Sequence, residues 1–130
     1  MKKFLFILIF CINLLGSERI VTLSPSINEI VFALEKGQNV VANTTFCDYP
    51  LESKNISKIG GYSSISLEKL LEAKPSIVIG QDYDEKLIDN LKALNIEVLS
   101  YKTNTIENIK NTITKLGVLF KKEEKANELT

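Results

Sequence analysis

Aromatic and acidic side chains gather in one polar stretch, residues 44–71, which is too rich in Gly, Ser, Asn and Pro to be a core element through its first two thirds. It carries Asp48, Tyr49 and Tyr62, with Phe46 close by. Exposed tyrosines are typical of binding sites, because a rigid aromatic face with a polar tip packs against a ligand. A surface loop whose tyrosines only cover the core is the alternative for the same residues.

The sequence lacks the side chains of most catalytic centres. It has no histidine, and Cys47 is the only cysteine after residue 17. Triads, His-based acid-base sites and ordinary zinc sites are therefore excluded, and no phosphate-binding glycine loop occurs. Asp82, Asp84 and Glu85 could approach a cation, but a helix dipole favours acidic residues at a helix start without any metal. We expect binding without catalysis, and no cofactor or metal.

The first 17 residues do not belong to the globular part. Lys2 and Lys3 precede an apolar run that is shorter than the roughly 20 residues needed to span a bilayer. This pattern predicts a secretory signal peptide at residues 1–17 and hence export, with an uncleaved anchor as the alternative. A lipoprotein signal at Cys11 is disfavoured, because the bulky Phe10 stands where a small residue is expected.

Charge and size limit the function classes. The 130 residues hold 16 basic and 16 acidic side chains, without a polybasic stripe, so nucleic-acid binding has no support. Apolar residues make up 45% of the chain, which is ordinary globular composition. We expect one domain at residues 18–120.

Strands and helices alternate along that domain. Short apolar runs predict strands at 19–23, 40–42, 76–80 and 97–99. Helical spacing predicts helices between them: from a Ser26/Glu29 capping box to a stop at Gly37, from Ser66 to Pro75, over 84–94, and from Thr105 to Phe120. Their expected core-facing residues include Leu70, Leu71, Leu91, Leu94, Ile106 and Ile113. This order predicts an α/β fold, a four-stranded parallel sheet with helices on both faces.

The expected sheet gathers the polar segments along one edge. Ligands of parallel sheets bind outside the carboxyl ends of the strands. The segments that follow the first three strands contribute the predicted ligand-binding residues Ser24, Pro25, Ser26, Asp48, Tyr49, Tyr62 and Gln81.

The last ten residues, 121–130, are charged and rich in helix formers, and they end without a stop signal. A helix that begins here has little to pack against before Thr130. We expect either that the chain continues or that this segment is a frayed polar tail.

Three blocks, RIVTLSPSINEIVFALEKG, TTFCDYP and KIGGYSSISLEKLLEAKPSIVIG, resemble the N-terminal lobe of the iron-siderophore and vitamin B12 periplasmic-binding family. These substrate-binding proteins of ABC importers have two lobes joined by one long helix. The resemblance implies a periplasmic location, a ligand cleft that faces a second lobe, and residues 121–130 as the truncated start of the linking helix. It implies an iron-siderophore, haem or vitamin B12 as ligand; B12-binding members tend to carry tryptophan where Tyr62 and Gln81 stand.

The resemblance also implies a second partner, the ABC importer permease. In the family, an outward glutamate of the Ser-Leu-Glu block pairs with arginines on the permease, and Glu68 occupies this place. A helix dipole alone would also favour a carboxylate at that position. The alternative function is a secreted single-lobe interaction module without a transport role. A small exported enzyme on a flavodoxin-like sheet is disfavoured by the missing catalytic side chains.

Overall fold

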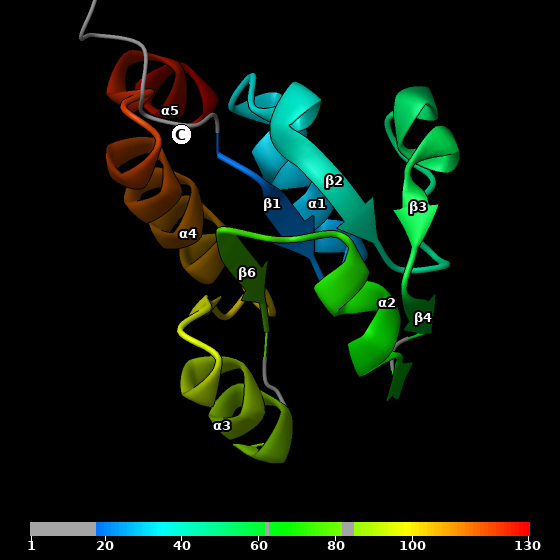
Figure 1. Cartoon of the computed structure of the whole chain (residues 1–130). Coiled ribbons are helices and arrows are strands. Elements are labelled where there is room, and N and C mark those ends of the chain that lie inside the picture. Colours follow the sequence, from blue (N-terminus) through cyan, green and yellow to red (C-terminus); the bar gives the residue numbers. More distant parts are fainter. Residues whose placement is uncertain (1–17, 62, 82–84) are drawn as a thin grey trace, which may run out of the picture.

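The computed structural model describes residues 18–61, 63–81 and 85–130, and its centre is a five-stranded parallel sheet (Figure 1). The strand order is β3-β2-β1-β6-β7. The strands are β1 (Ile20–Thr22), β2 (Val40–Asn43), β3 (Ser57–Lys58), β6 (Ile77–Gly80) and β7 (Glu97–Ser100). The four predicted strands are confirmed. The fifth, β3, has only two residues and no apolar pattern, so it lay hidden in the predicted loop.

Helices lie between the strands and after the last one, and none in the described ranges is long and apolar enough to cross a membrane. They are α1 (Pro25–Ala33), α2 (Leu67–Glu72), α3 (Glu85–Ala93), α4 (Ile106–Leu119) and α5 (Glu123–Leu129), with 3₁₀ turns η1 (Gly37–Asn39) and η2 (Leu51–Asn55). The predicted caps at Ser66 and Thr105 are confirmed: their side chains accept hydrogen bonds from the backbone N–H groups of Lys69 and Asn108.

The predicted start and stop of α1 were wrong. Ser24, not Ser26, caps the helix, and Pro25 is its first residue. Proline suits this position, because its fixed φ is helical and the first N–H of a helix has no intrahelical partner. The helix ends at Ala33 rather than at Gly37, and the backbone of Glu35 is left-handed (φ 63°).

The two faces of the sheet bury separate cores, and helices cover both faces as predicted (Figure 1). Side chains alternate along a strand, so Ile20 faces one core and Val21 the other. Helices α1, α4 and α5 cover the first face, while α2 and α3 cover the second. Three side chains expected in these cores are exposed instead: Leu71 of α2 (37% exposed), Leu94 just after α3 (52%) and Ile106 at the start of α4 (76%).

Helix α5 packs against α4, which contradicts the expectation that the last residues have little to contact. Lys121 has a left-handed backbone (φ 57°) and separates the two helices. Ala126 is 2% exposed, and a Cβ atom added to Gly117 would lie 2.5 Å from its Cβ atom. The backbone N–H of Lys122 also donates to the carbonyl of Gly117 at 2.7 Å. The segment is therefore an ordered part of the core layer.

Candidate ligand-binding edge

The strand order creates one point at which successive connections diverge. From β1 the chain proceeds outward through β2 to β3, whereas β6 and β7 extend the sheet on the other side of β1. The loops that follow β1 and β6 therefore leave the same edge in opposite directions, and such switch points are where open parallel sheets bind ligands. Ser24 follows β1 and Gln81 follows β6, so both predicted segments lie at this point.

Three neutral polar side chains close a hydrogen-bonded ring there, which we call the Ser26–Gln81–Thr103 ring. Gln81 Nε2 donates to Ser26 Oγ at 3.1 Å, and Thr103 Oγ1 donates to Gln81 Oε1 at 2.5 Å. The two hydroxyl oxygens lie 2.9 Å apart. Because Thr103 has only one hydroxyl proton and gives it to Gln81, Ser26 is the donor to Thr103. The sequence predicted Ser26 and Gln81 as ligand-binding residues but not Thr103. The position of Thr103 just beyond the fourth predicted strand is the feature that could have identified it.

Ser24 and Pro25 build the loop that carries Ser26. The Ser24 side chain is completely buried, and its Oγ accepts from the backbone N–H of Ile27 at 3.4 Å. Pro25 is half-buried at the first position of α1. Their contact with a ligand stays a prediction, whereas their role in starting the helix is visible.

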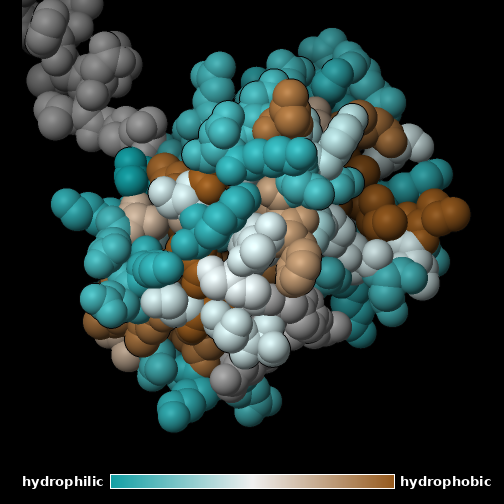
Figure 2. Space-filling model, turned by 90° about the vertical axis from the view of Figure 1, so that its right-hand side faces the viewer, coloured by the Kyte–Doolittle hydropathy of each residue, from teal (hydrophilic) through white to brown (hydrophobic). Residues whose placement is uncertain are grey.

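Asp48 and Tyr49 lie on an exposed segment beside the β2 side of the sheet. Tyr49 is 66% exposed, as is Phe46, and the Tyr49–Pro50 peptide bond is cis. Seen from the β3 side of the molecule, apolar side chains interrupt a largely hydrophilic surface (Figure 2). The expected exposed aromatic side chain at position 49 is therefore present. Tyr62 lies outside the described residues.

A buried asparagine ties this segment to the sheet. Asn28 of α1 is completely buried, and its Nδ2 donates to the backbone oxygen of Tyr49 at 3.1 Å and to Ser53 Oγ at 2.8 Å. Its Oδ1 accepts from Thr22 Oγ1 at 3.0 Å and from Asn43 Nδ2 at 3.2 Å. The amide thus joins β1, β2, η2 and the Tyr49 segment. The sequence did not predict this role of Asn28. The feature that could have identified it is a polar residue between the apolar positions of a helix.

Lys58 supports the same segment from β3. Its Nζ donates to Asn43 Oδ1 at 2.7 Å, to the Ser53 carbonyl at 2.8 Å and to the Cys47 carbonyl at 2.9 Å. Burial lowers the pKa of Lys58 from its ordinary value of 10.5, and the acidic groups of Cys47 and Asp48 act in the opposite direction. The ammonium therefore serves as an internal link between β2 and the loop, since all three of its protons have acceptors.

A tight hairpin follows β3, formed by β4 (Gly60–Gly61) and β5 (Ser64–Ile65). Gly60 has φ 127°, and a Cβ atom there would lie 2.1 Å from the Ser64 carbonyl oxygen, so only glycine fits. Asp82 and Asp84, weighed above as cation neighbours, lie outside the described residues. Within the described residues no group of three or more His, Cys, Asp or Glu side chains is placed to hold a metal ion.

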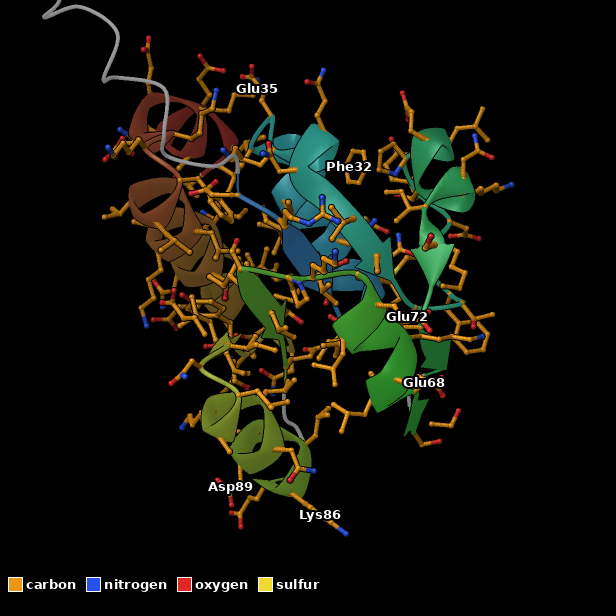
Figure 3. All side chains as sticks on the ribbon, viewed as in Figure 1. Phe32, Glu35, Glu68, Glu72, Lys86 and Asp89 are labelled. Carbon is orange, nitrogen blue, oxygen red and sulfur yellow. The ribbon has the colours of Figure 1, made fainter. Side chains whose placement is uncertain are left out.

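Glu68 lies in the first turn of α2 and is exposed, with Glu72 one turn later on the same helix (Figure 3). Leu70 is completely buried and Leu67 packs beside the same core. Helical spacing therefore keeps Glu68 on the solvent side, as the sequence predicts. Its role toward a permease stays a prediction.

The opposite edge of the sheet carries a separate hollow of about 630 Å³, which is not part of the predicted site. It lies beside the end of α1 and the start of β2, where Figure 3 shows Phe32 and Glu35 far from Glu68. Its lining residues are Phe32, Glu35, Gly37, Gln38, Val40, Glu52 and Ile56.

The described residues form an α/β lobe whose polar loops gather at the switch point of its sheet, and comparison with known proteins identifies its family. The chain belongs to the periplasmic binding protein family, whose model matches residues 20–130. It is 31% identical over 102 residues to a vitamin B12-binding protein of Vibrio parahaemolyticus. That match covers 77% of this chain but 37% of the relative.

Solved structures agree with this assignment. A periplasmic haem-binding protein of Roseiflexus sp. RS-1, in its apo form, superimposes with a TM-score of 0.79 at 26% identity over 88% of this chain and 45% of that protein. The periplasmic vitamin B12-binding protein of Vibrio cholerae gives a TM-score of 0.76 at 25% identity, over 85% of this chain and 46% of that protein. The chain thus spans less than half the length of these relatives.

Proposed function

We propose that this chain is the N-terminal ligand-binding lobe of a solute-binding component of an ABC importer, which takes a metal chelate or corrinoid (an iron-siderophore, haem or vitamin B12) and delivers it to a membrane permease. The observation that carries the proposal is the convergence of the Ser26–Gln81–Thr103 ring and the Tyr49 segment at one edge of the sheet. Relatives named for binding vitamin B12 or haem support it.

The remaining parts of the proposal concern location and lobe structure. Residues 1–17 direct export to the periplasm, and α5 begins the helix that links this lobe to a second one. Glu68 on α2 is the contact for the permease. The family match of residues 20–130 supports the assignments of α5 and Glu68, and the basic start and apolar run of residues 1–17 support export.

Titration of the chain with cyanocobalamin and with haemin, followed by absorbance, tests the binding. Tyr49→Ala should weaken the binding of the accepted macrocycle by about 1–3 kcal/mol, the usual loss for an aromatic anchor. Val118→Ala is the matched control, because Val118 is also a large exposed side chain (60%) but lies on α4. Equal affinity of both variants would remove Tyr49 from the site. Absence of binding to cyanocobalamin, to haemin and to a ferric siderophore would favour the protein-interaction alternative.

A further inference from the structure

We propose that the Ser26–Gln81–Thr103 ring is a specificity element, which pairs with neutral amide groups on the ligand and selects against carboxylates. The inference rests on the proposed function, because it takes this edge of the sheet as the ligand site. It adds the kind of side group that the site accepts, and it assigns the decisive role to Thr103.

The ring is accessible and well held. Its three side chains come from α1, from the end of β6 and from the loop between β7 and α4, and each is only half-buried. A ligand that enters the switch point therefore meets them together. The loop that carries Thr103 is fixed independently, because Thr112 Oγ1 donates to the Lys102 carbonyl at 2.9 Å.

The hydrogen-bond pattern of the ring matches an amide. Each member donates one hydrogen bond to the next member and accepts one from the previous member. A primary amide also donates and accepts, so it can join such a pattern while donors and acceptors stay balanced. A carboxylate only accepts, so it would have to draw protons out of the ring. The carboxylate would also lose hydration when it contacts three neutral groups, and this desolvation costs free energy.

Lys58 and Lys102 are the lysines to compare for this preference. Lys58 is already committed, because its Nζ donates to three acceptors beneath the Tyr49 segment. Lys102 precedes Thr103, and its side chain is exposed. If the ligand were held through carboxylates, Lys102 would be the residue that pairs with them, so it provides the matched comparison.

Two corrinoids separate these possibilities, since they share the macrocycle and the metal and differ in their side groups. Dicyanocobinamide carries amides, and dicyanocobyrinic acid carries carboxylates. Each is titrated into the chain and into Thr103→Val and Lys102→Gln, with absorbance for affinity and the Gln81 side-chain N–H₂ signals in ¹⁵N NMR as a local readout. Valine keeps the branched shape of threonine and removes the hydroxyl.

We expect the amide form to bind more tightly than the carboxylate form and to shift the Gln81 side-chain signals. Thr103→Val should weaken the amide form by about three- to tenfold, as for the loss of one neutral hydrogen bond, and leave the carboxylate form within about twofold. Lys102→Gln should leave the amide form unchanged. These results would support the ring as the specificity element.

Other outcomes would overturn the inference. If both corrinoids bind and Tyr49→Ala weakens them while Thr103→Val changes neither, the proposed function stands and the ring only links loops. Tighter binding of the carboxylate form, lost in Lys102→Gln, would show recognition by charge instead. If neither corrinoid nor haemin binds the chain, the inference fails; the proposed function fails with it only if a ferric siderophore does not bind either.

Discussion

The side-chain amide of Asn28 holds the backbone of Tyr49: Nδ2 lies 3.1 Å from the Tyr49 carbonyl oxygen, although the two residues are 21 positions apart. Asn28 belongs to α1, whose first turn also carries Ser26 of the ring. The same turn of helix therefore positions both halves of the proposed site. The backbone position of the exposed Tyr49 therefore depends on Asn28, which is completely buried.

Asn28→Ala should destabilise the protein by about 2–4 kcal/mol, because the Thr22 hydroxyl and the Asn43 amide each lose a buried partner. Urea unfolding measures the change. Asn55→Ala, at an exposed position of η2, serves as the control and should stay within about 0.5 kcal/mol of the wild type. A similar effect of both substitutions would argue against the network.

Lys58→Met should lower the free energy of unfolding by about 1–3 kcal/mol, since three carbonyl-type acceptors lose the ammonium that bridges them. Lys54→Met, which removes an exposed charge from η2, should have little effect. Chemical denaturation of the two variants at neutral pH makes the comparison. An unchanged Lys58→Met variant would mean that water replaces the ammonium without loss.

The titration of Lys58 should also give the stability a defined pH dependence. Its pKa in the folded protein lies below 10.5, so the unfolded chain binds more protons between the two pKa values. The free energy of unfolding of the wild type should therefore rise with pH through that window, relative to Lys58→Met. Burial, followed by the charge of Glu97, raises the pKa of Tyr101 above 10.0, which lowers stability only at higher pH. Urea unfolding from about pH 7 to about pH 10 isolates the Lys58 effect; a falling difference would contradict it.

Glu68→Gln should leave ligand affinity intact and reduce permease docking and uptake when this lobe forms part of a two-lobed protein. The loss should be larger at low ionic strength, because salt screens pairing between a carboxylate and arginines. Glu72→Gln, one turn further along α2, is the matched control. Equal uptake by both variants at all salt concentrations would leave Glu68 only its place at the start of the helix.

Gly117→Ala should loosen α5 from α4, because the added Cβ atom would lie 2.5 Å from the Cβ atom of Ala126. The overpacking costs about 1–3 kcal/mol, which cancels or outweighs the gain of about 1 kcal/mol in helix propensity. Hydrogen exchange should show protection of α5 in the wild type and its loss in the variant. Val118→Ala, next to it but exposed, should keep α5 protected. Rapid exchange of α5 in the wild type would instead support the frayed tail that the sequence suggested.

Local patterns in the sequence were sufficient for the α/β class. The apolar runs around Val21 and Val78 predicted central parallel strands, and the caps at Ser66 and Thr105 predicted two helix starts. Such features depend on neighbours within a few residues, so they can be read along the chain. The two-residue strand β3 could not be predicted, because its identity comes only from its pairing with β2.

The sequence by itself determined that strands alternate with helices, that these 130 residues contain no histidine, and that Ser26, Tyr49 and Gln81 follow strands. Only the tertiary structure placed Thr103 against Ser26, 77 positions away, and Asn28 beneath Tyr49. Hydrogen bonds of this kind depend on strand order and on which helix covers which face. Those are properties of the packed sheet, which no local spacing encodes.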